Sequence, residues 1–161
     1  MSIKCLSIVD ECFQDYKKAS MLISFPKCSG KCWKELGLDK SICHNHNYYD
    51  VIPKEYEIND IVSRYINNKV TSALILGGLE PFDSFNEIEE LIKSLRKECN
   101  DDIVIYTGYY PQEIEHRIKW LSQYSNIIVK FGRYIPNRDS KYDDILGIYL
   151  SSDNQYAKKI S

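Results

Sequence analysis

Three cysteines lie in one short, lysine-rich segment, FPKCSGKCWKELGLDKSICHN, as Cys28, Cys32 and Cys43. Three thiols cannot all pair within one disulfide, so a metal centre is the better interpretation. With His44 or His46 they could form the Cys3His set of a tetrahedral zinc site. The same three thiolates could instead bind three irons of a [4Fe-4S] cubane and leave the fourth iron open. Taken alone, this loop supports zinc and an iron–sulfur cluster equally.

The other three cysteines, Cys5, Cys12 and Cys99, stand apart, and we expect them to be structural thiols. The N-terminal stretch MSIKCLSIVDECF lacks a long apolar run, and no membrane-spanning segment is evident. We therefore expect a cytoplasmic protein, in a compartment where thiols stay reduced. The formal net charge is −2 at pH 7, which argues against nucleic acid or an anionic membrane as the main partner.

A second chemically informative stretch is LILGGLEPF, in which Gly77, Gly78 and Glu80 follow an apolar run. Glycines let the backbone approach a ligand closely. The carboxylate of Glu80 could accept a hydrogen bond from a ligand ammonium group. The pair of stretches, each directly after an apolar run, predicts a binding site more specifically than either one does alone.

Strands and helices alternate along the chain and must position these loops. Short apolar runs predict buried strands at residues 21–25, 72–76, 103–106 and 126–130. Apolar periodicity predicts helices at 59–68, from a capping-box pattern at Ser84 and Glu87 onward, and after Pro111. Further strands are expected near residues 3–9 and 145–150.

This alternation predicts a single α/β domain, residues 1–161, with a parallel sheet and helices packed on it. A complete eight-stranded barrel needs roughly 250 residues, so we expect a partial, open β/α barrel with parallel strands. Ligands bind beyond the carboxyl ends of such strands. Both informative loops, together with those after residues 106 and 130, should therefore meet at one rim.

These residues resemble a known family, the small radical SAM activating enzymes of anaerobic ribonucleotide reductase, which are akin to the pyruvate formate-lyase activators. The resemblance extends from about Ser24 to Ile160. The matching motifs are the Cys-x3-Cys-x-Φ-Cys signature, with Ile42 in the apolar position before the last cysteine, the GGE-type motif, YTGY at 106–109, VKFGRYI at 129–135 and LSSDNQ at 150–155.

The resemblance implies a radical SAM fold in which Cys28, Cys32 and Cys43 bind a [4Fe-4S] cluster. S-adenosylmethionine would chelate the fourth iron through its amino and carboxylate groups. The residues implied for binding it are Ile42, Gly77, Gly78, Glu80, Tyr106 and Asn154.

The implied partners are a low-potential electron donor and the large subunit of anaerobic ribonucleotide reductase. One electron would cleave S-adenosylmethionine into methionine and a 5′-deoxyadenosyl radical. That radical would take a hydrogen from a glycine Cα of the large subunit. No acid–base residue is required, and none is assigned.

Two departures from the family pattern stand out. The family has two residues between its last two cysteines, whereas this chain has the ten residues 33–42. Leu79 is inserted between Gly78 and Glu80. Alongside the activase, two hypotheses stay open: a radical SAM enzyme acting on another protein or peptide, and a zinc-stabilised α/β adaptor using His44 or His46.

Overall fold

The computed structural model describes all residues, 1–161. The strands are β1 (Ser2–Cys5), β2 (Ser7–Cys12), β3 (Ser20–Phe25), β4 (Lys54–Glu57), β5 (Ala73–Gly78), β6 (Asp102–Tyr106), β7 (Ile127–Phe131), β8 (Lys141–Asp143), β9 (Ile148–Leu150) and β10 (Tyr156–Lys159). The α-helices are α1 (Lys31–Lys34), α2 (Ile58–Asn67), α3 (Phe85–Leu95) and α4 (Glu115–Leu121). Short 3-10 helices are η1 (Lys40–Ile42), η2 (His46–Asp50), η3 (Pro81–Ser84) and η4 (Pro111–Glu113).

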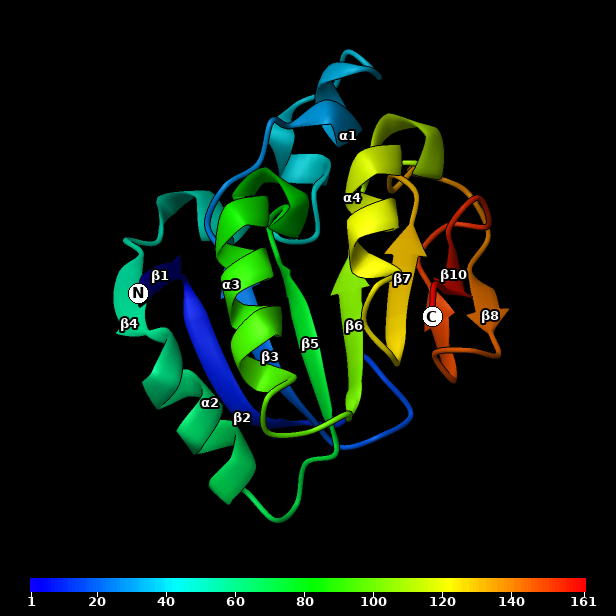
Figure 1. Cartoon of the computed structure of the whole chain (residues 1–161). Helices are drawn as coiled ribbons and strands as arrows, with labels where there is room; N and C mark the ends of the chain where they lie inside the picture. Colours follow the sequence, from blue (N-terminus) through cyan, green and yellow to red (C-terminus); the bar gives the residue numbers. More distant parts are fainter.

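A six-stranded sheet with the order β10-β7-β6-β5-β3-β2 forms the centre of the molecule (Figure 1). Its four inner strands, β3, β5, β6 and β7, pair in parallel, as the sequence predicts. The edge strands β2 and β10 pair antiparallel with their neighbours, so the sheet is mixed. No helix lies between β2 and β3, and antiparallel neighbours can be joined without one. The description of this sheet as part of an open barrel stays a prediction.

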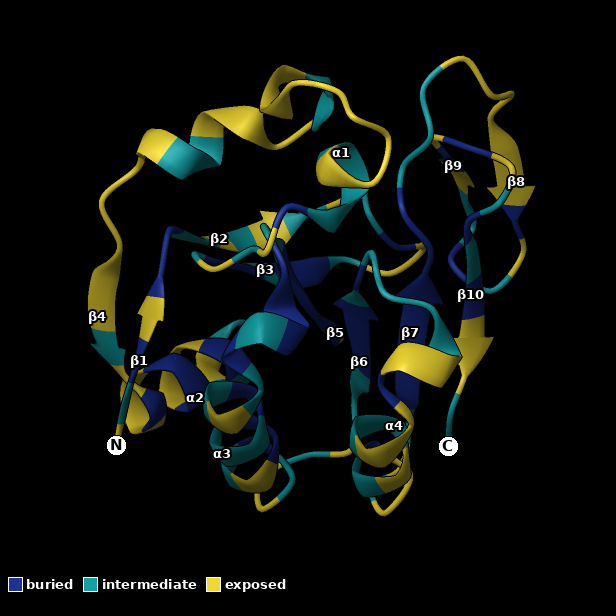
Figure 2. Ribbon diagram, turned by 90° about the horizontal axis from the view of Figure 1, so that it is seen from above, coloured by how far each residue is buried: buried dark blue, intermediate teal, exposed yellow.

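Helices α2, α3 and α4 cover one face of the sheet (Figure 2). Their apolar residues are buried as predicted, among them Ile61 and Tyr65 in α2 and Ile88 and Leu91 in α3. They pack against alternate strand residues in one large apolar cluster. The predicted capping box at Ser84 is wrong, because the Ser84 side chain forms no cap hydrogen bond and α3 continues from η3.

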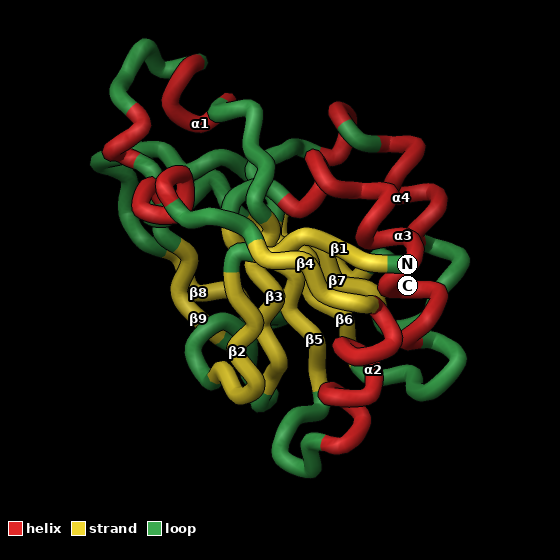
Figure 3. The backbone as a smooth tube through the Cα atoms, turned by 90° about the vertical axis from the view of Figure 1, so that its left-hand side faces the viewer, coloured by secondary structure: helices red, strands yellow, loops and turns green.

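The opposite face of the sheet is covered over only part of its area. The β8–β9 hairpin lies on this side, away from α2, α3 and α4 (Figure 3). Leu146 and Leu150 pack there against Val104 and Ile128, near the start of the inner strands. Two residues further along the same strands, Tyr106 and Lys130 line an open pocket instead. Because strand side chains alternate between faces, these residues share the face that the helices leave free.

A small two-stranded sheet of β1 and β4 lies beside the central sheet at the N-terminal end of α2. None of the helices has the length and apolar character needed to cross a membrane.

Candidate iron–sulfur site

The cysteine loop begins directly after β3, at the carboxyl end of that strand. Cys28 lies three residues beyond Phe25, Cys32 lies within α1 and Cys43 follows η1. All three thiols are free and half-buried. The loop is tied to the rest of the rim, because the Ser29 N–H donates to Asp83 Oδ2 at 2.9 Å.

The thiols of Cys28 and Cys32 lie in a poorly solvated environment. Burial raises the pKa of both, and for Cys32 the charges of Cys28, Cys43 and Glu80 act in the same direction. The Gly30 N–H donates to Cys28 Sγ at 3.2 Å. A Cβ at Gly108 would come within 3.1 Å of Cys32 Sγ, so the absence of a side chain there makes room for the thiol.

The donor set of this loop is compatible with an iron–sulfur cluster. No three histidine, cysteine, aspartate or glutamate side chains are arranged to hold one metal ion. A zinc site would need four ligands converging on one point. A cubane cluster binds each cysteine through a different iron, so three neighbouring thiols that do not converge are compatible with it.

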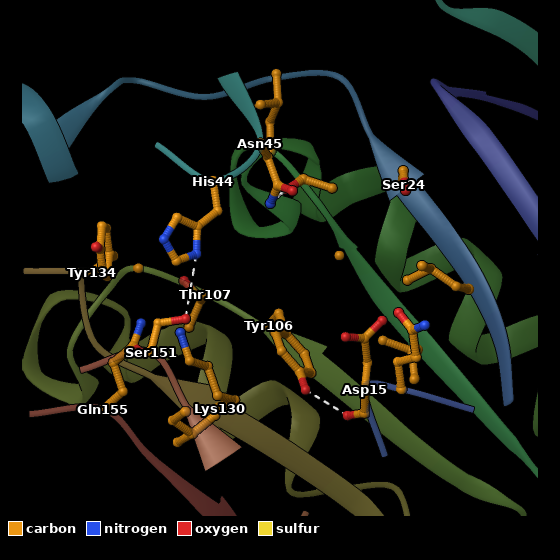
Figure 4. Close-up of a pocket in the computed structure, with 18 of the residues that line it drawn as sticks. Asp15, Ser24, His44, Asn45, Tyr106, Thr107, Lys130, Tyr134, Ser151 and Gln155 are labelled. Atoms are coloured by element: carbon orange, nitrogen blue, oxygen red, sulfur yellow. Dashed lines mark hydrogen bonds between the residues drawn. The ribbon is translucent and has the colours of Figure 1, made fainter. Parts of the chain in front are cut away.

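The two histidines offered as alternative ligands make other contacts. The His44 ring lies 4.2 Å from that of Tyr134, and its Nδ1 is 3.3 Å from Ser151 Oγ (Figure 4). His46 Nδ1 is 2.8 Å from the carbonyl oxygen of Cys43. Neither residue completes a set with the three cysteines.

A pocket of about 730 Å³ opens beside the cysteine loop, on the face of the sheet that the helices leave free. Cys32 and Cys43 line it on one side, and the carboxyl ends of β3, β5, β6 and β7 form its floor. The buried hydroxyl of Ser24 in this lining has no hydrogen-bond partner. The loops expected to meet at one rim are therefore brought together around a single cavity.

Gly77 and Gly78 both line this pocket. Gly78 has φ +87°, and a Cβ there would lie 2.6 Å from the backbone nitrogen of Phe25. A side chain would therefore separate β5 from β3 at their carboxyl ends. The carbonyl oxygen of Gly78 also accepts a hydrogen bond from Asn45 Nδ2 at 2.8 Å, which joins this loop to the cysteine loop.

The Glu80 carboxylate is buried just behind the pocket and is absent from its lining. It accepts hydrogen bonds from Thr107 Oγ1 at 2.8 Å, Phe82 N at 3.0 Å and Gly108 N at 2.9 Å. Burial raises the pKa of Glu80 to about 7, although these three donors favour the ionised form. The carboxylate therefore connects the segments that follow β5 and β6. It lies outside the pocket lining, but close enough for its charge to act on Cys32 and Lys130.

The remaining residues expected to bind a cofactor have different positions. Ile42 and Tyr106 line the pocket, and the Tyr106 hydroxyl donates to the Asp15 carbonyl oxygen. Asn154 lies outside the lining, and its Nδ2 donates to the Arg133 carbonyl oxygen at 2.7 Å. Its neighbour Gln155 reaches the pocket instead.

Lys130 is a site residue that sequence reasoning did not single out. The residue is 8% exposed, and its side chain points into the pocket between Ser151 and Tyr106 (Figure 4). Nζ donates only to the Gly132 carbonyl oxygen, at 3.3 Å, and forms no ion pair. Burial lowers the pKa of Lys130 to about 8, against the charges of Cys32 and Glu80, so the ammonium is mostly charged at neutral pH. A lysine in an otherwise apolar strand was the available sequence signal.

The edge strand β2 and the loop after it line the side of the pocket away from the cysteine loop. Cys12 and Asp15 both belong to this lining, and Cys12 Sγ donates to Asp15 Oδ2 at 3.3 Å. Cys12, which we expect to be a structural thiol, is half-buried and borders the cavity. The sequence did not predict that Cys12 would lie at the pocket, because it is far along the chain from most of the other lining residues.

The chain belongs to the family described as a 4Fe-4S single cluster domain, which it matches over residues 10–156. The match includes all three clustered cysteines and supports an iron–sulfur cofactor over the zinc alternative. Neither the curated proteins nor the solved structures that were searched contain a match.

Proposed function

We propose that this protein is a radical SAM activase that generates a glycyl radical on the large subunit of anaerobic ribonucleotide reductase. One observation carries the proposal. In a chain of the 4Fe-4S single cluster family, the cysteine loop and the Gly77–Gly78 loop border the same pocket at the carboxyl ends of parallel strands. A cluster with three protein thiolates has room for a small ligand there. The mixed sheet would then be the floor of a partial, open barrel.

Cys28, Cys32 and Cys43 would hold the cluster beside the pocket that Cys32 and Cys43 line. When bound and reduced, the cluster would supply one electron to S-adenosylmethionine, which breaks a carbon–sulfur bond and gives methionine and a 5′-deoxyadenosyl radical. The electron would come from a low-potential donor. Hydrogen transfer from a glycine Cα to that radical would yield 5′-deoxyadenosine and a glycyl radical.

The pocket residues would bind and orient the amino-acid end of S-adenosylmethionine. Its ammonium group would lie against Gly77 and Gly78, where the negative charge of Glu80 stabilises it from behind. Its carboxylate would pair with Lys130, which is the buried cation of the lining and has only one hydrogen bond of its own. Ile42 would contact the adenosine end, with Tyr106 in the floor and Asn154 supporting the wall.

The proposal is tested by anaerobic reconstitution with iron and sulfide. Dithionite-reduced protein should convert S-adenosylmethionine to 5′-deoxyadenosine, and addition of the large reductase subunit should give a glycyl-radical electron paramagnetic resonance signal. Replacement of Cys28, Cys32 or Cys43 by alanine should abolish the cluster and the cleavage. Cys99→Ala is the control, because this thiol lies outside the pocket.

The outcomes separate the alternatives. Cleavage without a glycyl radical on the reductase would favour another protein or peptide substrate. A cluster that binds but never cleaves S-adenosylmethionine would contradict the radical SAM function. One tightly bound zinc and no iron would contradict both.

A further inference from the structure

The ten residues between Cys32 and Cys43 are anchored to the rim of the sheet through one arginine. Glu35, in this insert, accepts a hydrogen bond from Arg133 Nη2 at 3.0 Å. The Glu35 side chain is 53% exposed, whereas that of Arg133 is 9% exposed. The insert therefore supplies an anion to a largely buried cation that belongs to the segment after β7.

Arg133 simultaneously binds two other parts of the rim. Its Nη1 donates to Glu113 Oε2 at 2.8 Å and to the Gly108 carbonyl oxygen at 3.2 Å. Glu113 in turn pairs with Lys31 Nζ at 3.2 Å. We call Lys31, Glu35, Glu113 and Arg133 the arginine clamp. Charge-assisted, multiply bonded arginine contacts of this kind are geometrically specific.

The clamp encloses the position of Cys32. Lys31 precedes Cys32 and Glu35 follows it by three residues, so both ends of this helical turn are attached to the clamp. On the facing side, Arg133 donates to the Gly108 carbonyl oxygen, and Gly108 lies so near Cys32 that a Cβ there would come within 3.1 Å of the thiol sulfur. The Arg133 guanidinium group thus links Glu35, just after α1, to Gly108, just after β6.

A second contact anchors the same insert near Cys28. Trp33 Nε1 donates to the Tyr49 hydroxyl at 3.3 Å, and the Trp33 ring occupies the space next to Gly30, where a Cβ would lie 2.7 Å from the ring. The Gly30 N–H in turn donates to Cys28 Sγ at 3.2 Å. The insert thus contacts the surroundings of two of the three thiols.

We propose that the insert, through Glu35, completes the arginine clamp and so helps to retain the cluster, with Arg133 and Glu35 as positioning residues that hold Cys32 at the iron–sulfur site. The insert then contributes to retention of the cluster, whatever substrate the protein acts on. This inference needs the cluster but does not need S-adenosylmethionine cleavage, so the two proposals can fail separately.

The test measures how fast an iron chelator bleaches the reconstituted protein anaerobically, without any substrate. Glu35→Gln is the main variant, because its exposed side chain can change without disturbing the core. We expect chelator release about 3- to 10-fold faster than in the wild type, because glutamine keeps an acceptor oxygen but loses the charge that strengthens the hydrogen bond to Arg133. Arg133→Gln should release iron faster still, and Arg133→Lys should not restore the wild-type rate, because lysine cannot bond several partners in one plane.

Arg138→Gln is the matched control, since Arg138 pairs with Asp153 at 3.2 Å on the exposed surface. It should release iron at the wild-type rate. In the double variant with Arg133→Gln, the additional effect of Glu35→Gln should disappear, because both act through the same contact. The reduced-cluster electron paramagnetic resonance spectrum should change in the clamp variants and remain unchanged in Arg138→Gln.

Three results would overturn the proposal. The first is release from Glu35→Gln at the rate of the Arg138→Gln control. The second is a Glu35→Gln effect that persists in full when Arg133 is replaced. The third is a loss of stability in the cluster-free Glu35→Gln protein large enough, by urea unfolding, to account for the faster release.

Discussion

Glu80 and Lys130 place two buried, oppositely charged groups at the pocket without an ion pair between them. Glu80 is held by three hydrogen-bond donors, whereas Lys130 has one carbonyl partner. Burying a charge is costly unless it is paired or well hydrogen-bonded. A zwitterionic amino-acid group, with its ammonium toward Glu80 and its carboxylate toward Lys130, would offset the free-energy cost of burying each of these two charges.

The charge of Glu80 gives the cluster-free protein a specific pH dependence. The pKa of Glu80 is about 7 in the folded state and 4.5 in the unfolded state, so the folded protein binds this proton more tightly. Its contribution to stability is fully present below pH 4.5 and is lost as the pH rises to about 7, a change of about 3 kcal/mol. Urea unfolding from pH 5 to 8 should show this loss in the wild type and not in Glu80→Gln. Parallel pH curves for the two proteins would contradict the assignment.

Lys130→Met tests the carboxylate subsite. The variant keeps the apolar stem and removes the ammonium, so S-adenosylmethionine should bind the reconstituted protein about 10-fold to 100-fold more weakly in calorimetric titration. The cluster-free protein should lose no stability, because a poorly paired buried charge is removed. Lys97→Met, at an exposed position, is the control. Equal affinities in the two variants would exclude Lys130 from the subsite.

The carboxyl ends of β3 and β5 are held together by a backbone contact that admits no side chain. Ser24 and Phe25 pair with Gly77 and Gly78 at the last two positions of the parallel ladder. Beyond this pair the Leu79 and Glu80 N–H groups donate to the carbonyl oxygens of Phe25 and residue 27. The start of the cysteine loop is thus attached to the glycine loop by main-chain hydrogen bonds, which explains how two distant motifs share one pocket.

Gly78→Ala should disrupt this contact. The added Cβ would meet Phe25 N at 2.6 Å, so we expect a loss of stability of about 2 kcal/mol or more and weaker cluster binding. Gly37→Ala is a close control, because Gly37 also has positive φ but a Cβ there meets nothing within 4 Å. Urea unfolding and iron content measure the two effects. Equal destabilisation in both variants would show that the loss of stability comes from the positive φ, and not from the contact between the new Cβ and the backbone of Phe25.

The molecule consists of a well-packed body and a site that is formed mainly by loops. The sheet and the helices α2, α3 and α4 share one large buried apolar cluster, whereas α1, η1 and η2 contain no buried residue. Segments with few buried contacts open at low free energy. The conformation of the cysteine loop is therefore held mainly by polar contacts, such as that of Glu35 with Arg133, and a bound cluster would stabilise it further.

Removal of the cluster should accordingly loosen the loop and leave the body folded. We expect hydrogen exchange to accelerate at residues 28–50 in the chelator-treated protein and to remain unchanged in α3. The melting temperature should fall on cluster removal, because a group bound only to the folded state stabilises that state. Accelerated exchange throughout the sheet would show instead that the cluster is needed for the whole fold.

Local sequence was sufficient for the four inner strands, the apolar faces of α2 and α3 and the two loops at the rim, because these depend on short-range patterns of burial. Local sequence did not predict the antiparallel edge strands or the absence of a side-chain cap at Ser84. Strand partners and the angle at which the chain enters a helix are set by tertiary contacts. The same holds at the site. The cysteines and glycines of the site can be recognised in the sequence by their type and spacing. The burial of Lys130, the position of Cys12 at the cavity and the convergence of Glu35, Glu113 and Arg133 arise only when distant segments pack together.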